Sequence, residues 1–449
     1  MIKIYCPSNN IPERRYSIEV LFNHLMGCDV SEDSICFRDD VEDYIVKVGE
    51  KQMVIEDHFF SKYREPLSYL KGSSLPKELT FLHAKGQEIP IIYGVDKYVE
   101  TEDDLTIGLD IFASTFFMLT RWEESIYGRD EKGDCNENLL FGVVHGICKR
   151  PVVNEYEFFL RGILSQWGVQ MKQREYKVVL THDVDGLITP TWSGIIRGLL
   201  FSMKTGSQQR LTWKQKVAYR RVFPNAYSQV DIYVKLCEQY NIPEWFFFKV
   251  CAPHETEATY SYDDMRVKDV VEKLNHLNTH QIRLGFHPSQ STINNYEQWE
   301  SECHRIKELL GGEPLVGRNH HLLYNLQMLR WWEESFFTEG CFDISNCVFH
   351  RHQGFRSGMV VDYPIFDYYE RRQMQLMEHP NSIMDTAIRY SVEKKGTEQI
   401  DSELREIISM VKRFKGELIL TWHIYLRNKK LINDYIKYAE KIVRYATGC

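Results

Sequence analysis

Hydrophobic and polar positions follow two different patterns along the chain. Up to about residue 175, strand-like alternation at 2–7 and 44–57 is mixed with the three- and four-residue apolar spacing of amphipathic helices, at 11–26, 110–124 and 154–167. From about residue 176, short apolar runs alternate with longer helical patterns, as in βα units that surround a parallel sheet. We therefore expect a smaller α/β domain at 1–175 and a larger βα domain at 176–449.

The second part contains six candidate strands, at 176–185, 244–250, 282–288, 314–320, around 375–380, and 417–423. Helical patterns lie between and after them, at 265–277, 295–310, 402–414 and 431–446. A (β/α) barrel and an open sheet share this alternation. The pattern therefore predicts the α/β class and leaves the closure of the sheet open.

The interval 186–230 is predicted to be an insertion after the first of these strands. It carries seven basic residues: Arg197, Lys204, Arg210, Lys214, Lys216, Arg220 and Arg221. A solvated pair of basic helices is one interpretation. Because apolar residues are interleaved with the basic ones, a lip that contacts a membrane surface or an anionic sugar phosphate is the other.

Composition and charge narrow the classes of function. The 449 residues include 55 Lys and Arg against 63 Asp and Glu, a formal charge of -8, which argues against a nucleic-acid binder with a broadly basic surface. The eleven cysteines form no CxxC pair, and no secretory signal is visible in MIKIYCPSNN. No apolar stretch reaches the roughly 18–20 residues that span a bilayer. We expect a cytoplasmic protein with reduced thiols and no transmembrane segment.

Ionisable residues recur where the candidate strands end. They are Asp183 and Asp185 after KVVLTH, His287 after IRLGF, Arg318 and His320 after PLVG, and His423 after LILTW. In parallel α/β folds the active site assembles at the C-terminal edge of the sheet, because loops from several strands converge there. We therefore expect these side chains to form a catalytic edge.

Carboxylates together with imidazoles are a suitable ligand set for a divalent metal, zinc above all. In Asp183-Val184-Asp185, the two-residue period of a strand would point both carboxylates the same way. One of them could then bind the metal while the other accepts a proton. The DxD pattern is unspecific by itself, so the other strand-end residues carry this interpretation.

Four motifs in this order, THDVD, GFHPS, GFRSG and LTWH, resemble those of the polysaccharide deacetylase superfamily, also called carbohydrate esterase family four. The segments IPERRYSIEVLF and DIFASTFFMLTRWEE resemble an uncharacterised domain that often precedes such deacetylases in bacteria. The resemblance spans nearly the whole chain. It implies a distorted (β/α) barrel and a metal-dependent hydrolysis of an acetamido group.

Carried onto this sequence, the resemblance implies that Asp185 binds the metal and that Asp183 is the general base. His287 matches the first metal-binding histidine of the second motif. The second histidine of that motif is replaced by Ser291. His320 in GRNHHLL is our candidate for the replacement ligand or for a substrate contact, with a packed structural histidine as the alternative. His350 and His352 are further candidates.

The resemblance also implies three supporting roles. Arg356 in GFRSG would pair with and orient the catalytic aspartate, as a bidentate guanidinium can. His423 would be the general acid that protonates the departing amine. Asp385 in SIMDTA would orient this histidine.

The predicted function is therefore removal of an acetyl group from an N-acetylated sugar in a polysaccharide or its precursor, with Zn²⁺ as the expected metal. An O-acetyl esterase or a deformylase on the same barrel is an alternative. A catalytically degenerate barrel that binds glycans or acts as a scaffold is another, because Ser291 stands in a ligand position. A glycosidase using Asp183 and Asp185 is disfavoured, since such enzymes usually take their carboxylates from different strands.

Overall fold

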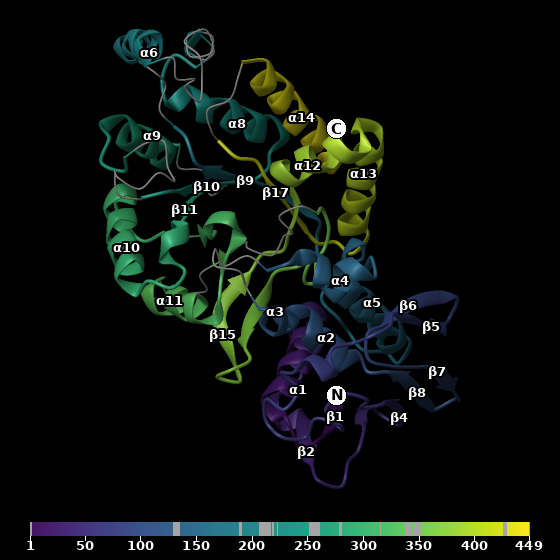
Figure 1. Cartoon of the computed structure of the whole chain (residues 1–449). Helices are drawn as coiled ribbons and strands as arrows, with labels where there is room; N and C mark the ends of the chain where they lie inside the picture. The colour runs from purple at the N-terminus through teal and green to yellow at the C-terminus, as the bar shows by residue number, and fades with distance from the viewer. Residues whose placement is uncertain are drawn as a thin grey trace.

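The computed structural model describes residues 2–128, 135–187, 191–205, 217, 220–221, 223–250, 261–277, 281–314, 316–336, 343–344, 352–424 and 429–448. Two large sheets organise these residues, one in each part of the chain (Figure 1). The α/β class is confirmed. The basic residues Arg210, Lys214 and Lys216 and the candidate His350 lie outside the described residues.

The N-terminal sheet is mixed and has the strand order β2-β1-β3-β4-β8-β7. Its strands are β1 (Ile2–Pro7), β2 (Ile35–Arg38), β3 (Tyr44–Val48), β4 (Lys51–Ile55), β7 (Gly94–Glu100) and β8 (Asp104–Leu109). A separate hairpin consists of β5 (Thr80–Ala84) and β6 (Gln87–Ile91). The strand predicted at 2–7 is therefore confirmed, and the alternation at 44–57 corresponds to two antiparallel strands.

Helices of the N-terminal part include α1 (Ile11–Ile18), which continues as a π-helical segment to Leu25, α2 (Ile111–Thr120), α3 (Glu123–Tyr127), α4 (Phe141–Val144) and α5 (Val152–Gln166). All ten residues of α2 are buried, as expected for a helix that is apolar on every side. Asp110 caps this helix by accepting a hydrogen bond from the backbone N–H of Ala113 at 3.0 Å.

The C-terminal sheet has the order β14-β15-β13-β12-β11-β10-β9-β17-β16, and every neighbouring pair is parallel except β14 with β15. Its strands are β9 (Lys177–Val184), β10 (Glu244–Phe248), β11 (Ile282–Phe286), β12 (Val316–Gly317), β13 (Asp343–Ile344), β14 (Tyr363–Asp367), β15 (Arg372–Glu378), β16 (Asn381–Met384) and β17 (Glu417–Thr421). Strands β9 to β13 follow one another along both the chain and the sheet, which is the arrangement of successive βα units.

Helices flank this sheet on both sides. They are α6 (Trp192–Thr205), α8 (Tyr227–Tyr240), α9 (Met265–His276), α10 (Tyr296–Leu310), α11 (Leu326–Phe336), α12 (Asp385–Lys395), α13 (Thr397–Arg413) and α14 (Lys429–Thr447). Figure 1 shows α9, α10 and α11 along one side of the strands and α12, α13 and α14 along the other. No helix in the described ranges has both the length and the apolar character that crossing a bilayer requires.

The parallel sheet forms a half-barrel, and the closed barrel implied by the resemblance stays a prediction. No pairing among the described residues joins β16 to β14 or β15. However, only His379 and Pro380 separate β15 from β16, which lie near opposite ends of the strand order. The chain itself therefore links the two sides of the curved sheet.

The two parts of the chain pack closely against each other. The Tyr16 hydroxyl donates a hydrogen bond to the backbone oxygen of Pro364 at 2.7 Å, and Arg371 pairs with Glu13 at 2.8 Å. The rings of Phe116 and Phe366 are 5.4 Å apart. Buried residues of both parts belong to one continuous hydrophobic cluster. The boundary at 175 therefore separates two sheets that share a core.

Candidate active site

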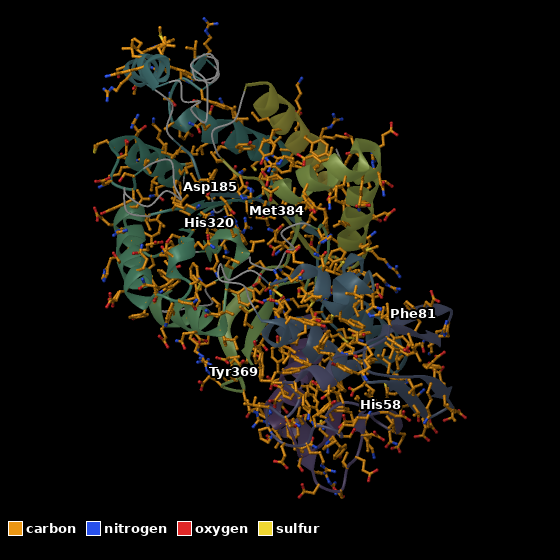
Figure 2. The ribbon with its side chains drawn as sticks, in the orientation of Figure 1. His58, Phe81, Asp185, His320, Tyr369 and Met384 are labelled. Carbon is orange, nitrogen blue, oxygen red and sulfur yellow. The ribbon has the colours of Figure 1, made fainter. Side chains whose placement is uncertain are left out.

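The C-terminal edge of the parallel sheet brings together six of the seven predicted site residues. Asp183 lies on β9, and Asp185 follows it directly. The others come from just beyond the strand ends: His287 after β11, His320 after β12, Asp385 after β16 and His423 after β17. Figure 2 shows Asp185 and His320 near each other at this edge.

Asp185, His287 and His320 form a candidate metal centre. One ligand atom from each residue lies within 4.8 Å of the others. Ser291 is outside this group: it is exposed, and its hydroxyl is hydrogen-bonded to that of Ser289 at 2.8 Å. His320, and not Ser291, is therefore the third member of this candidate group.

The hydrogen bonding of His287 fixes the tautomer of its ring. Its Nδ1 lies 2.6 Å from the backbone oxygen of Arg318. Because a carbonyl can only accept, Nδ1 carries the proton and Nε2 presents a lone pair, as in metal-bound histidines. Nε2 is buried and has no hydrogen-bond partner among the described residues. Burial lowers the pKa of His287 to about 3, against the opposing effect of Asp183, so the ring stays neutral as a ligand must.

His320 reaches the site from a short helical turn. The predicted strand at 314–320 is wrong in extent, because pairing is limited to Val316 and Gly317. The chain then turns at His320–Leu322, with His321 at φ 55°. The His320 ring lies 5.3 Å from that of His287, centroid to centroid, which brings both imidazoles to the same place.

Asp183 is a buried carboxylate held by an equally buried guanidinium. Arg318 Nη1 donates to Asp183 Oδ1 at 2.8 Å, and Arg318 Nη2 donates to Thr181 Oγ1 at 2.9 Å. Burial by itself raises the pKa of Asp183, but Arg318, His287 and His423 outweigh it and hold the pKa well below its usual range. Asp183 is therefore ionised at neutral pH.

The predicted pairing of Arg356 with the catalytic aspartate is wrong. Arg356 Nη2 instead lies 2.8 Å from Oε1 of Glu124 on α3, and Glu124 Oε2 accepts a hydrogen bond from the Tyr324 hydroxyl at 3.1 Å. The physical reason is the packing of the N-terminal part, which places a buried carboxylate against the loop that carries Arg356. Arg318 takes the position beside Asp183.

His423, which is partly buried, and the buried Asp385 form a second pair. Asp385 Oδ1 accepts a hydrogen bond from His423 Nδ1 at 2.6 Å, which leaves Nε2 facing Asp183 Oδ2 at 3.5 Å. Burial lowers the pKa of His423, but Asp385, Asp183 and Asp185 together raise it to about 9. The imidazole is therefore protonated at neutral pH and can donate a proton from Nε2.

Lys249 is a site residue that the sequence analysis did not select. Its side chain is fully buried beyond the end of β10, and its Nζ lies 2.8 Å from Asp185 Oδ1. Burial by itself would raise the pKa of Asp185, but the pKa is lowered, and this ammonium group is the main cause. Lys249 directly follows the apolar run WFFF, so it stands at the end of a candidate strand, as the acids and histidines do. The search for ionisable residues at strand ends would therefore have found it.

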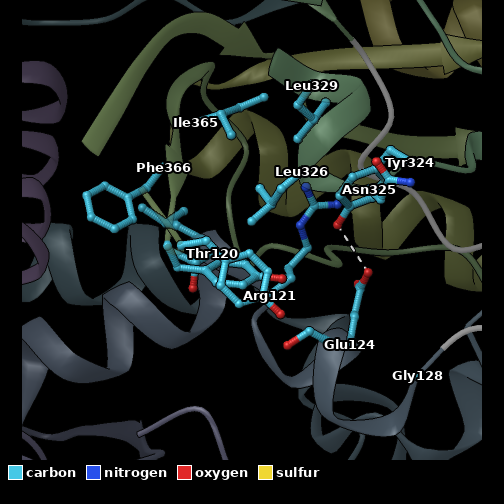
Figure 3. A pocket seen from close by; sticks show the side chains of 14 residues that line it. Thr120, Arg121, Glu124, Gly128, Tyr324, Asn325, Leu326, Leu329, Ile365 and Phe366 are labelled. Atoms are coloured by element: carbon cyan, nitrogen blue, oxygen red, sulfur yellow. Dashed lines mark hydrogen bonds between the residues drawn. The ribbon is translucent and has the colours of Figure 1, made fainter. Parts of the chain in front are cut away.

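A cavity of about 300 Å³ lies at the seam between the two parts of the chain (Figure 3). Arg121, Glu124 and Tyr324 line it together with apolar side chains such as Leu326. The Arg121 guanidinium lies 4.6 Å from the centre of the Tyr324 ring. Tyr324 follows His320 by four residues, so one short segment lines this cavity and supplies a candidate ligand.

Comparisons with known proteins give different results for different parts of the chain. A family of unknown function (DUF7033) matches residues 2–168. None of the curated proteins matches the chain. A proposed polysaccharide deacetylase involved in O-antigen biosynthesis from Bordetella bronchiseptica has 13% identity and a TM-score of 0.30, covering 61% of this chain and 85% of its own. A proposed polysaccharide deacetylase from Mycobacterium smegmatis has 14% identity and a TM-score of 0.35, covering 60% and 85%. Both of these solved structures are thus described as proposed polysaccharide deacetylases, and the N-terminal part of this chain matches a family without a known function.

Proposed function

We propose that the protein is a metal-dependent hydrolase that removes the acetyl group from an N-acetylated sugar of a polysaccharide or its precursor. The observation that carries this proposal is the convergence of three elements on one sheet edge. These are the Asp185–His287–His320 group, the ionised Asp183 held by Arg318, and the protonated His423 held by Asp385. Free thiols such as Cys6 and Cys303 fit the cytoplasm as the compartment.

Asp185, His287 and His320 would hold the metal. Their donor set of one carboxylate and two imidazoles suits Zn²⁺, and the buried Nε2 of His287 is a nitrogen that requires a partner. A bound divalent ion supplies Lewis acidity that polarises a carbonyl group and acidifies water. The structural feature that supports this assignment is the tautomer of His287, which the Arg318 carbonyl fixes.

Asp183 and His423 would carry the proton transfers. Because Arg318 keeps Asp183 ionised, its Oδ2 is available to accept a proton from the attacking water. His423 would donate its Nε2 proton to the departing nitrogen, since an amine is a poor leaving group unless it is protonated. These two atoms, Asp183 Oδ2 and His423 Nε2, lie 3.5 Å apart.

The protonated state of His423 favours an amide substrate over the alternatives. An ester leaves as an alcohol, which needs less assistance from an acid, so an O-acetyl esterase would gain less from the Asp385–His423 pair. A deformylase would use the same groups on a smaller acyl group. These catalytic groups therefore do not distinguish an acetyl from a formyl substrate.

A metal-free glycan-binding protein is the second candidate function, and Lys249 is the observation that favours it. Its buried ammonium group already neutralises Asp185 at 2.8 Å, as a bound cation would. In that case the side chains at the sheet edge would bind sugar hydroxyl groups and would catalyse no reaction. The two functions differ in whether the protein holds a metal.

Metal content of the full-length protein, purified without chelator, separates them. We expect one equivalent of zinc or another divalent metal, lost in Asp185→Asn and in His287→Ala. His379→Ala is the matched control, because this partly buried histidine pairs with Glu417 outside the candidate centre. The same proteins would be tested for acetate release from N-acetylglucosamine oligomers. Absence of metal after incubation with Zn²⁺, Co²⁺ and Ni²⁺ would contradict the hydrolase proposal.

A further inference from the structure

Helix α6 displays an apolar stripe to solvent. Trp192, Ile196, Leu200 and Met203 are 52%, 56%, 60% and 76% exposed, respectively. Their spacing of four, four and three residues places them on one face of the helix. Figure 1 shows α6 at the end of the molecule opposite the N-terminal part. A contiguous exposed stripe of this kind marks an interaction surface rather than ordinary surface variation.

The side of α6 that borders the stripe packs on the protein. Ile195 is 4% exposed, and Leu199 is half-buried. These residues therefore bury one edge of a wider apolar face, and the rest of that face is exposed. Packing among the described residues thus leaves the stripe uncovered.

Basic groups lie beside the stripe. Arg197 and Lys204 are both exposed, and at 100° per residue they lie along the border of the stripe. The guanidinium of Arg220 lies 5.6 Å from the centre of the Trp192 ring. The sequence from 186 to 230 contains the seven basic residues named above and no acidic residue, although the whole chain carries a formal charge of -8. Among the described residues, Arg197, Lys204 and Arg220 thus place positive charge beside the exposed apolar face.

We propose that α6 lies on the surface of an anionic membrane, with its stripe inserted at the boundary between headgroups and acyl chains. Apolar and interfacial aromatic side chains flanked by Arg and Lys are the features that bind helices to such surfaces. With 14 residues, α6 is too short to span the roughly 30 Å hydrocarbon core, so it would lie in the plane of the membrane. A second copy of the chain is a poor occupant, because two such faces would bring like charges together.

Co-sedimentation of the full-length protein with vesicles tests this proposal. We compare pure phosphatidylcholine vesicles with vesicles that contain about 30% phosphatidylglycerol. We expect binding to the anionic vesicles at least about tenfold stronger, decreasing as salt is raised, because salt screens the attraction. The Ile196→Ser/Leu200→Ser variant should lose at least about tenfold in affinity, since it removes apolar area that would be buried. Arg197→Glu/Lys204→Glu should abolish the preference for anionic lipid.

Val144→Ser is the matched control, because Val144 is 60% exposed and lies in α4, far from α6 in the sequence. It should bind vesicles like the unmodified protein. The thermal unfolding temperature of each variant verifies that it is folded. Equal binding to both vesicle types, or unchanged binding of the Ile196→Ser/Leu200→Ser variant, would overturn the proposal. A lipid-free dimer that this variant disrupts, measured by light scattering, would assign the stripe to a second copy instead.

Discussion

Arg318 Nη1 lies 2.8 Å from Oδ1 of Asp183, and the two side chains are 0% and 5% exposed. We predict that Arg318→Met lowers deacetylation at least about hundredfold, because an unpaired buried carboxylate takes up a proton or draws in water. The same variant should lose about 3–5 kcal/mol of stability, as is usual when one partner of a buried pair is removed. Acetate release and urea unfolding measure the two effects.

The matched control is Arg356→Met, which breaks the pair with Glu124 at the seam instead. This variant should lose stability but keep kcat within about tenfold of the unmodified value. The opposite result, in which Arg356→Met loses kcat and Arg318→Met retains it, would return Arg356 to the role that the resemblance implied.

Lys249 should weaken metal binding. Its ammonium lies 2.8 Å from Asp185 Oδ1, where it repels an incoming cation and occupies a ligand atom. We predict that Lys249→Met binds Zn²⁺ about tenfold more tightly, a change of about 1.4 kcal/mol. Competition with a chromophoric chelator measures the affinity, and Lys235→Met, which breaks an exposed pair with Asp231, is the control. Weaker zinc binding by Lys249→Met would show that Lys249 positions Asp185 rather than competing for it.

The pH dependence of kcat/KM should report His423. Its raised pKa of about 9 means that the acid form is fully present at neutral pH and is lost as pH rises through that value. We therefore expect activity to fall on the alkaline side of about pH 9. Asp385→Asn removes the strongest of the carboxylates that raise this pKa, so the alkaline limb should move to lower pH. Asp401→Asn, which breaks a pair with Lys441 on other helices, should leave the limb in place. An unmoved limb in Asp385→Asn would contradict the assignment.

Leaving-group chemistry gives an independent test of His423. If it protonates the departing nitrogen, His423→Ala should lower hydrolysis of an acetamido sugar by about 10²-fold or more. Hydrolysis of an aryl acetate should fall by less than about tenfold, since its leaving group needs no proton. Both rates are measured on the same zinc-loaded preparation. Equal losses on the two substrates would mean that His423 does not act as the acid.

The sequence predicted the elements that depend on local pattern. The expected strand at 2–7 is β1, and the expected helix at 265–277 is α9, because periodicity alone specifies amphipathic elements. Strand-end positions likewise located Asp183, Asp185, His287 and His423. The half-barrel curvature of the sheet was not predictable, since barrels and open sheets share the same alternation of strands and helices.

The partners of charged side chains were harder to predict from the sequence than the positions of those side chains. The sequence places Arg318 and Arg356 equally well for pairing with Asp183, and only the tertiary packing distinguishes them. Glu124 captures Arg356 because α3 and the loop before β14 meet at the seam. Such a contact between residues 232 positions apart leaves no trace in local periodicity. The burial of Lys249 was likewise not predictable from local sequence, because it depends on the strands that neighbour β10 in the sheet.

Glu123, next to the seam, should make stability depend on pH. Burial, with Glu124 nearby, raises its pKa from 4.5 to about 7, although its Oε2 accepts the backbone N–H of Phe141 at 2.9 Å. Between these values the folded state holds a proton that the unfolded state has released, so stability is greatest below about pH 4.5 and falls as pH rises towards and through 7. The change is at most about 3 kcal/mol.

Glu123→Gln keeps the acceptor and removes the titration, so its free energy of unfolding in urea should vary less between pH 5 and 8. Glu50→Gln, at an exposed position, is the control and should follow the unmodified protein. Identical pH slopes for Glu123→Gln and the unmodified protein would show that Glu123 is already ionised in the folded state.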